Sequence, residues 1–342
     1  MQSIVEQNRT SAANPPGQPI LQVTNLVVEF ASKGGAVTVL NGVSLTIGEG
    51  EVLGLLGESG SGKSVTGLSI LGLLPKGKGR IAGGSVQFSG KEISRFNEAQ
   101  MRQLRGKSLS MILQDPLTSL NPVFNIGWQI AESLRLHQVV PVNRIRERTI
   151  ALLRRLRIPA AEARLASFPH QFSGGMRQRV VAAIALASDP ALLVADEPTT
   201  SLDVTVQSHF LRMLREIQRE RKLSVLFITH DLGVIARICD RAAVMYAGRI
   251  VEEAPVAELF DAPQHPYTQA LLATLPRIGN RHVRLPGIEG QPPRLDQLPV
   301  GCAFAPRCVQ AHDICRERPP GESYLSPSHR VACWLHDGGA EQ

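Results

Sequence analysis

The sequence contains no long apolar run, and its first residues have little of the apolar character that export signals need. No window of its 342 residues approaches the ~18 uninterrupted apolar residues of a membrane span, so no segment is expected to cross a bilayer unaided. The first residues, MQSIVEQNRTSAANPPGQP, include Glu6 and Arg9 and have no apolar centre. This composition argues against a cleaved secretory signal and predicts a flexible polar tail over residues 1–18. We therefore expect the protein to remain in the cytoplasm.

Internal repeats are absent too, and the composition is ordinary. Apolar residues make up 43% and charged residues 20% of the chain, as in soluble globular proteins. The length suits one large body with an appendage. A net charge of +7 is compatible with nucleic acid or anionic lipid, but the two basic clusters, 144–148 and 154–157, have helical spacing. We interpret them as a solvated helix face near a membrane or a partner.

Cysteine is scarce and unevenly placed. Of the five cysteines, four lie in the last 41 residues: Cys302, Cys308, Cys315 and Cys333. Their spacing, C-x5-C-x6-C-x17-C, lacks the paired C-x2-C knuckles of common zinc modules, yet four thiols in a proline-rich tail suit a four-sulfur metal site. In a reducing compartment such crowding indicates a metal more often than disulfides. Unliganded thiols are the alternative, and Cys239 is expected to be a small buried residue.

Short apolar runs rich in β-branched residues alternate with stretches of helical periodicity, which predicts an α/β fold. The early runs that precede the first expected helix, 23–30 and 43–47, are expected to form a small antiparallel sheet, and 85–90 is one more apolar run of this kind. Four further runs are expected to be buried parallel strands: 51–57, 111–115, 192–196 and 225–230.

The texture of the sequence changes near residue 262. Before this point, residues 211–222 predict an amphipathic helix and residues 242–254 predict one more strand. After it, prolines accumulate and the periodicity is lost. We therefore predict a main domain over residues 19–262 and an irregular extension over residues 263–342.

The stretch GESGSGKS, residues 57–64, joins an apolar run to a helical one. It satisfies the pattern G-x-x-x-x-G-K-[ST] through four residues: Gly57, Gly62, Lys63 and Ser64. Glycines let successive backbone N–H groups turn inward and a helix start adds partial positive charge, so the loop can cradle a chain of phosphates. Lys63 is expected to reach the β- and γ-phosphates and the Ser64 hydroxyl to bind Mg²⁺. The helix is expected to run from Lys63 to about Leu74, where Pro75 stops it.

Two adjacent carboxylates, Asp196 and Glu197, follow the apolar run 191–195. Asp196 is placed to hold Mg²⁺ through water, and Glu197 to polarise an attacking water. Such a pair is often only part of a solvated loop. The phosphate loop elsewhere in the chain favours the catalytic interpretation.

A third element, HQFSGGMRQRVVAAIALASDP at 170–190, begins another helix with bare backbone amides. Ser173 is its expected N-cap, followed by Gly174 and Gly175. The order of phosphate loop, Ser-Gly-Gly helix and strand ending in Asp-Glu resembles that of ATP-binding cassette (ABC) proteins over residues 20–260. This resemblance implies an α/β P-loop nucleotide-binding domain with a mixed sheet core, an antiparallel β subdomain and a helical subdomain, here followed by a small irregular cysteine-rich extension.

The resemblance assigns roles to further residues. Gln114 would meet Mg²⁺ and report the nucleotide state, His230 would contact the γ-phosphate, and Asp203 would lie at a dimer seam. Glu197, His230 and Gln114 are thus the expected catalytic residues. Phe30 is the expected adenine-stacking aromatic, with a buried strand phenylalanine as the alternative. The complete nucleotide site is expected to comprise Phe30, Gly57, Glu58, Ser59, Gly60, Ser61, Gly62, Lys63, Ser64 and Asp196.

In this family the Ser-Gly-Gly helix of one subunit points at the ATP held by the phosphate loop of a second. This chain has one of each, so two cassettes are expected to meet head to tail, as a homodimer or with a paralogue, through Ser173, Gly174 and Gly175 acting in trans. Phe172 and Met176 depart from the leucine and glutamine usual at the two ends of the signature. The departure puts in question whether Met176 can replace a polar contact.

A finer likeness is to the ATPase subunits of dipeptide and oligopeptide ABC importers. It is carried by QDPLTSLNP, PHQFSGGMRQR, ADEPTTSLDV and HPYTQALL. It implies ATP-driven peptide uptake at the cytoplasmic face of the membrane, with two permease subunits, an external substrate-binding protein and no nucleic acid. Phe124 and Trp128 are expected either to contact a permease or to pack in the core. The alternatives are nickel, glutathione or peptide-antibiotic uptake, or a soluble ABC ATPase acting on nucleic acid.

The same group of importers carries a cysteine tail. The likeness implies a 4Fe-4S cluster at Cys302, Cys308, Cys315 and Cys333, with zinc or unliganded thiols as alternatives. The expected cofactors are therefore ATP, Mg²⁺ and this cluster. We expect the metal to order a tail too small to build its own core.

Overall fold

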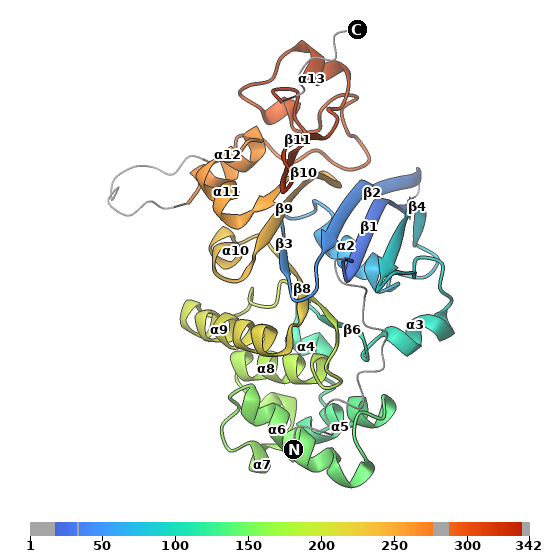
Figure 1. Ribbon diagram of the computed structural model, residues 1–342, viewed down its shortest axis with the longest axis vertical. Helices are drawn as coiled ribbons and strands as arrows, with labels where there is room; N and C mark the ends of the chain where they lie inside the picture. The colour runs from blue at the N-terminus through green and yellow to red at the C-terminus, as the bar shows by residue number, and fades with distance from the viewer. Residues whose placement is uncertain (1–17, 33, 276–286, 337–342) are drawn as a thin grey trace.

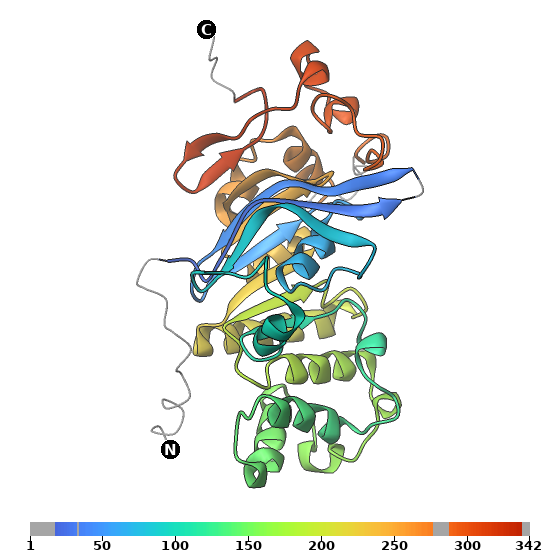
Figure 2. The same cartoon turned by 90° about the vertical axis from the view of Figure 1, so that its right-hand side faces the viewer.

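Two sheets form the centre of the protein, whose computed structural model describes residues 18–32, 34–275 and 287–336. The predicted tail, 1–18, lies outside the described residues except for its last member. Figures 1 and 2 show the sheets between a lobe of helices and the C-terminal segment, so that the described chain is elongated.

The smaller sheet has four antiparallel strands in the order β2-β1-β4-β5. Their bounds are Leu21–Ser32 for β1, Gly35–Ile47 for β2, Gly79–Phe88 for β4 and Lys91–Glu92 for β5. Alternate residues of β1, including Leu21 and Val23, are buried, as expected of a sheet with one face on a core. The predicted antiparallel sheet is thereby confirmed.

The larger sheet has eight strands in the order β11-β12-β10-β9-β3-β8-β7-β6. Four of them are the predicted parallel strands: Val52–Leu56 (β3), Leu109–Ile112 (β6), Leu192–Asp196 (β7) and Ser224–Thr229 (β8). Every residue of β3, β7 and β8 is buried, which explains why these strands read as unbroken apolar runs rather than as alternating ones.

The single strand predicted over 242–254 is wrong, because the chain reverses in its middle. Ala247 and Gly248 both have positive φ, and the segment divides into β9 (Arg241–Tyr246) and β10 (Arg249–Pro255), which pair antiparallel. β10 then pairs with β12 (His329–Val331), which pairs with β11 (Ser323–Ser326). The last strands of the C-terminal extension therefore complete the main sheet.

Helices cover the larger sheet and follow its strands. They are Lys63–Ile70 (α2), Val204–Arg221 (α9), Leu232–Ile238 (α10), Val256–Asp261 (α11) and Pro266–Ala273 (α12). The helix α2 ends earlier than predicted, because the left-handed Gly72, at φ +61°, stops it before Pro75. Helix α9 extends the predicted 211–222 helix toward its N-terminus and buries Phe210, Leu214 and Ile217 on one side.

A lobe of helices lies beyond α9 (Figure 1). It contains Pro116–Ser119 (α4), Ile126–Leu136 (α5), Ile145–Arg155 (α6), Ala161–Arg164 (α7) and Gly174–Ala185 (α8), with 3₁₀ turns at Val142–Arg144 (η1) and Pro169–Gln171 (η2). The helix Glu98–Leu104 (α3) lies beside the smaller sheet. The predicted basic face is ion-paired within the chain, since Arg157 meets Glu216 at 2.6 Å and Arg148 meets Asp189 at 2.7 Å.

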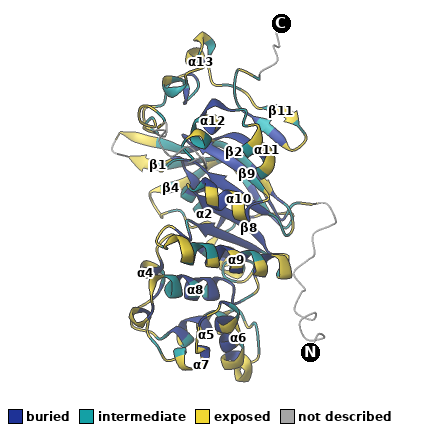
Figure 3. Ribbon diagram, turned by 90° about the vertical axis from the view of Figure 1, so that its left-hand side faces the viewer, coloured by how far each residue is buried: buried dark blue, intermediate teal, exposed yellow. Residues whose placement is uncertain are grey.

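The C-terminal extension, 263–342, begins with α12 and has little other regular structure beyond its strands. It contains the 3₁₀ turn Ala305–Arg307 (η3) and the short helix Asp313–Glu317 (α13). It nevertheless joins the main core, because the rings of Phe304 and Tyr267 are buried there. In Figure 3 the central strands of the sheet are buried, whereas much of the extension is intermediate or exposed. Within the described ranges, no helix has the length and apolarity needed to span a membrane.

Candidate functional site

The phosphate-loop stretch, residues 57–64, connects β3 to α2 as the sequence predicted. At Gly57 a Cβ atom would lie 2.2 Å from the carbonyl oxygen of Met245 and 2.8 Å from Ser61 Oγ, so no other residue fits there. Gly62 has φ +108° and caps the N-terminus of α2. The start of the helix thus has open backbone amides of the kind that bind phosphate oxygens.

Lys63 and Ser64, the first residues of α2, have defined partners. The Lys63 Nζ atom donates to the carbonyl oxygens of Gly57 at 2.8 Å and Glu58 at 2.9 Å, so its ammonium lies over the loop. The Ser64 hydroxyl donates to Asp196 Oδ1 at 3.0 Å, which joins the loop to the end of β7. A serine oxygen and a carboxylate brought together in this way are suitable ligands for Mg²⁺, directly or through water.

Burial shifts the titration of these groups. Desolvation lowers the pKa of Lys63, although the nearby carboxylates of Glu197 and Asp196 oppose the shift. Desolvation raises the pKa of Asp196, and the hydrogen bond from Ser64 opposes it. Both shifts have the same main physical cause, the loss of water around a buried charged group, and perturbed titration of this kind is frequent at functional sites.

Glu197 lies at the centre of three side chains. Its carboxylate accepts a hydrogen bond from Gln114 Nε2 at 3.1 Å and from the Thr200 hydroxyl at 2.9 Å, and it lies 3.2 Å from His230 Nδ1. The structure thus brings together Glu197, Gln114 and His230, which belong to three separate segments of the sequence. Thr200 was not predicted, although it lies in the same ADEPTTSLD run.

The environment of Glu197 keeps its carboxylate ionised. Burial alone would raise the pKa of Glu197, but the hydrogen bonds from His230 and Thr200 outweigh burial and lower it. The backbone of Glu197 has φ +45° and its N–H donates to Ile228 O at 2.9 Å, so the residue is held just beyond the end of β7. A charged carboxylate fixed in this way can accept a proton from a water molecule.

The Ser-Gly-Gly helix begins away from this site. Ser173 is the N-cap of α8, and Ser173 and Gly174 are both exposed. Figures 1 and 2 show α8 in the helical lobe and α2 among the strands, so the chain does not close these two segments on one another. Asp203, at the N-cap of α9, is exposed and accepts from Val206 N–H at 2.9 Å. The groups of Ser173 and Gly174 that could donate hydrogen bonds to an anion are therefore accessible to solvent.

The two departures from the usual signature have clear positions. Phe172 is buried and packs with the main core, with the guanidinium of Arg164 5.4 Å from its ring centroid. Met176 is half-buried against the same core. Phe30 is half-buried in β1, and its ring would lie 3.0 Å from a Cβ built on Gly79. Its contacts in the described chain are those of a packed strand residue.

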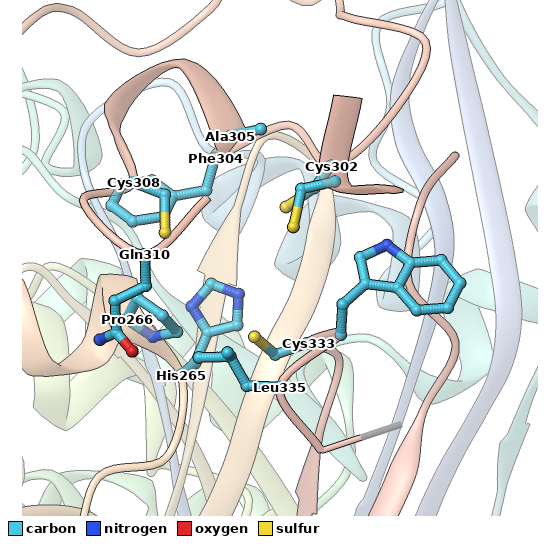
Figure 4. Close-up of a pocket in the computed structure, with 11 residues that line it drawn as sticks. His265, Pro266, Cys302, Phe304, Ala305, Cys308, Gln310, Cys333 and Leu335 are labelled. Atoms are coloured by element: carbon cyan, nitrogen blue, oxygen red, sulfur yellow. The ribbon is translucent and has the colours of Figure 1, made fainter. Parts of the chain in front are cut away.

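Cys302, Cys308, Cys315 and Cys333 line one small cavity, together with aromatic rings that include Phe304 and Trp334. Figure 4 shows the sulfurs of Cys302, Cys308 and Cys333 directed toward the space between them. Within the described ranges, no three His, Cys, Asp or Glu side chains have the arrangement needed to hold a single metal ion. The predicted 4Fe-4S or zinc site is therefore not shown, although its four thiols are gathered in one place. Cys239 is buried in the core, as expected.

Two residues of the C-terminal region contact the phosphate loop. No role in the site was predicted for either, although Tyr267 lies in the HPYTQALL run. The Tyr267 hydroxyl accepts from Glu58 N–H at 3.0 Å. The Arg307 guanidinium donates to the Glu58 carboxylate at 2.7 and 3.1 Å. The loop is therefore held from outside the predicted main domain.

Comparison with known proteins agrees with this geometry. The family described as ABC transporter matches residues 40–200, and the family described as oligopeptide/dipeptide transporter, C-terminal region, matches residues 251–315. The chain is similar to a probable peptide ABC transporter ATP-binding protein of Sinorhizobium fredii, with 48% identity over 94% of this chain and 96% of that protein. It is 45% identical to a dipeptide transport ATP-binding protein of Bacillus subtilis, over 95% of this chain and 97% of that one.

The structure is also similar to solved ones. A dimeric bacterial ABC transporter cassette aligns with a TM-score of 0.62 and 25% identity, covering 69% of this chain and 98% of that one.

Proposed function

The chain belongs to the ATP-binding subunits of oligopeptide and dipeptide ABC transporters, which are ATPases, and from that premise we propose that it powers the import of dipeptides or oligopeptides across the cytoplasmic membrane. The observation that carries the catalytic part of this proposal is the convergence of Gln114, Thr200 and His230 on Glu197. Glu197 is the expected base, and the phosphate loop lies across the end of the same sheet.

Each residue of the site has a proposed role. Glu197 takes the proton of the attacking water, His230 orients that water and contacts the γ-phosphate, and Gln114 senses the metal. Ser64 and Asp196 hold Mg²⁺, which would neutralise charge on the phosphates. Lys63 and the amides of residues 57–62 bind the β- and γ-phosphates, and Phe30 stacks on the adenine. The contacts of Lys63 with the loop carbonyls would be exchanged for contacts with phosphate oxygens.

A second cassette, identical or paralogous, completes the proposed site. The exposed Ser173, Gly174 and neighbouring Gly175 would meet the ATP held by the partner's phosphate loop, with Asp203 at the seam. ATP then joins the two cassettes, and hydrolysis separates them, because the bridging γ-phosphate is lost. That the similar solved cassette is dimeric supports this arrangement.

The four thiols of Cys302, Cys308, Cys315 and Cys333 are donors of the kind that a metal centre needs, and they line one cavity, although their present arrangement is not that of a metal site. Their cavity has no carboxylate in its lining, and four soft sulfur donors suit an iron-sulfur cluster or zinc. We propose a 4Fe-4S cluster, with zinc as the alternative. When bound, it would link four positions in the last 41 residues of an extension, 263–342, that has little regular structure.

The proposed setting is the cytoplasmic face of the membrane. The family implies two permease subunits as the membrane partners, and we add an external substrate-binding protein that delivers the cargo. The exposed pair of Phe124 and Trp128 would contact a permease. No role for nucleic acid is proposed.

Reconstitution tests the proposed function. The chain is combined with its permeases and binding protein in liposomes, and uptake of labelled di- and oligopeptides is measured with ATP inside the vesicles, next to the Glu197→Gln variant. Peptide uptake that requires ATP and Glu197 supports the proposal. Uptake of nickel, glutathione or a peptide antibiotic without peptide uptake would show that the proposed cargo is wrong. ATP hydrolysis stimulated by nucleic acid but not by permeases would show that the proposed transport function is wrong.

A further inference from the structure

The C-terminal extension holds the second residue of the phosphate loop at two points. Glu58 lies in the loop, and its carboxylate receives a two-pronged hydrogen bond from Arg307, with Nη1–Oε2 at 2.7 Å and Nη2–Oε1 at 3.1 Å. Its backbone N–H donates to the Tyr267 hydroxyl at 3.0 Å. Arg307 lies 249 residues further along the chain, so this is a contact of the finished fold.

The ion pair between Arg307 and Glu58 is largely buried, and the orientation of its guanidinium is fixed by further hydrogen bonds. The side chain of Arg307 is 5% exposed and that of Glu58 25% exposed. Arg307 also donates to the Tyr246 hydroxyl at 3.3 Å and to Glu289 O at 3.0 Å, so its guanidinium has no freedom to turn away. A paired, planar guanidinium of this kind fixes both the position and the orientation of a carboxylate.

Aromatic rings support the same two side chains from below. Tyr246 and Tyr267 have ring centroids 4.6 Å apart, and each packs on Phe304 at 5.3 Å. Phe304 belongs to the extension and is buried in the main core. The Tyr267 hydroxyl and the Arg307 guanidinium are therefore held in place by the packing of these three aromatic rings.

The position of Glu58 affects the groups that bind phosphate. Lys63 Nζ donates to the carbonyl oxygen of Glu58 at 2.9 Å, so a shift of Glu58 moves a partner of the ammonium. The amides that follow Glu58 in the loop must also point inward together. A loop that is ordered before the nucleotide arrives loses less conformational entropy on binding. Its apparent affinity for nucleotide rises in proportion to the fraction of molecules whose loop already has the binding conformation.

We propose that Arg307 and Tyr267 are positioning residues for the nucleotide-binding loop, which makes the C-terminal extension part of the ATP site. The proposal rests on the proposed role of the phosphate loop. It predicts that these residues raise affinity for nucleotide and leave the chemical step nearly unchanged, because neither touches Glu197 or its hydrogen-bonding partners in the described structure.

The experiment measures the Kd of fluorescent MANT-ATP with Mg²⁺ for the full chain, together with KM and kcat. Arg307→Ala is expected to raise Kd and KM about tenfold with kcat within twofold, and Arg307→Lys, which keeps the charge but loses the fork, to lie between. Tyr267→Phe keeps the ring and removes one hydroxyl, for an expected threefold rise in Kd, about the worth of one hydrogen bond. Arg294→Ala is the control, because Arg294 is exposed and pairs with Asp296 within the extension.

A double-mutant cycle separates positioning from general packing. If the pair acts through Glu58, then adding Arg307→Ala to Glu58→Gln raises Kd by much less than Arg307→Ala does alone. Thermal unfolding checks that each variant is folded, and if Arg307→Ala does not fold, Tyr267→Phe decides the question. A folded Arg307→Ala or Tyr267→Phe variant with the Kd of Arg294→Ala would overturn the proposal.

Lys63→Ala distinguishes this failure from failure of the proposed function. If Lys63→Ala loses MANT-ATP binding while Arg307→Ala does not weaken it, the loop binds nucleotide and only the positioning role is wrong. If Lys63→Ala binds as the wild type does, the loop is not the nucleotide site and the proposed function and the positioning role both fail.

Discussion

At the scale of single residues, the carboxylate of Glu197 is the group on which the chemistry depends. Replacing it by glutamine keeps the shape of the side chain and removes the charge that would accept a proton. We expect Glu197→Gln to hydrolyse ATP 10²- to 10⁴-fold more slowly, with MANT-ATP affinity changed less than about threefold. A phosphate-release assay measures the rate, and size-exclusion chromatography with ATP detects the expected closed dimer.

Glu220→Gln is the matched control for that substitution, because Glu220 is an exposed carboxylate on α9 that pairs with Arg155. Its hydrolysis rate should equal that of the wild type. A Glu197→Gln variant that turns over ATP as fast as this control would show that another group is the base.

Among single residues, we expect His265 to make folding stability depend on pH. Burial, with a smaller contribution from His336, lowers the pKa of His265 to about 3 from 6.5. The unfolded chain therefore binds a proton between pH 6.5 and pH 3 that the folded chain does not bind, so stability falls as the pH falls through this window. From pH 7 to pH 5 the loss from this group is about 2 kcal/mol.

The substitution His265→Asn tests this dependence. His265 is the N-cap of α12 and accepts from Tyr267 N–H at 3.0 Å through Nδ1, and asparagine can accept the same bond without titrating. Urea unfolding followed by tryptophan fluorescence should show a smaller loss between pH 7 and pH 5 for His265→Asn than for the wild type. His209→Asn, at an exposed position of α9, should lose as much as the wild type.

Much of the site could be predicted at this scale, because its residues follow strand ends or begin helices in fixed patterns. Ser64, Asp196 and Glu197 are of this kind. The contacts of Thr200, Tyr267 and Arg307 could not be predicted. Thr200 and Tyr267 lie in runs that indicate the family, but a run does not say which carboxylate or loop its side chains contact in the fold. The contact between Arg307 and Glu58 joins residues 249 positions apart, so it depends on how the whole intervening chain folds.

At the scale of elements, helix α5 presents two stacked aromatic rings to solvent. Phe124, just before the helix, and Trp128 have centroids 4.1 Å apart and planes 14° apart, and their side chains are 38% and 37% exposed. Of the two readings of the sequence, contact and core, the exposure supports contact. We expect Trp128→Ala to weaken association with the permeases about 30-fold, as for a tryptophan at the centre of an interface, and to leave the ATPase rate of the isolated chain unchanged.

Leu136→Ala is the control on the same helix, since Leu136 is 73% exposed at the opposite end. Association can be followed by co-purification with tagged permeases from detergent, at several concentrations. Equal association by the two variants would exclude this face of α5 as the contact.

Element types were predicted better than element ends. The parallel strands were recognisable because burial on both faces demands continuous apolar runs. The reversal at Ala247 and Gly248 was hidden, because an apolar hairpin and one long apolar strand share the same composition. The stop of α2 depended on the left-handed backbone of Gly72 and not on the more conspicuous Pro75.

At the scale of the whole molecule, four thiols of the C-terminal extension line one cavity against the main core. We expect anaerobically purified protein to contain bound metal, with about four iron and four sulfide per chain for the cluster or one zinc for the alternative. Cys302→Ser, Cys308→Ser, Cys315→Ser and Cys333→Ser should each reduce that content by more than half and lower the thermal midpoint. Elemental analysis with absorbance spectroscopy provides the measurement.

Cys239→Ala is the control, because Cys239 is buried in the core and absent from the lining of the cysteine cavity. It should keep the full metal content. Wild-type protein with neither iron nor zinc, or serine variants that retain as much metal as Cys239→Ala, would show that these thiols are unliganded.

The extension was predicted as an appendage, and its participation in the main sheet was not foreseen. Short strands such as β12 cannot be recognised in a proline-rich segment, because three residues do not establish a period. The partner that β12 needs, β10, lies far away in sequence.

That arrangement has a consequence for the newly made chain. Glu252 of β10 is synthesised 77 residues before His329 of β12, whose Nε2 atom lies at hydrogen-bond distance, 2.9 Å, from the Glu252 carboxylate. Ribosomes add ~5–20 residues each second, so the edge of β10 stays open for about 4–15 s during synthesis. A message that ends before this strand is translated would leave that edge permanently available to other strands, and such a product should aggregate instead of accumulating as a smaller soluble ATPase.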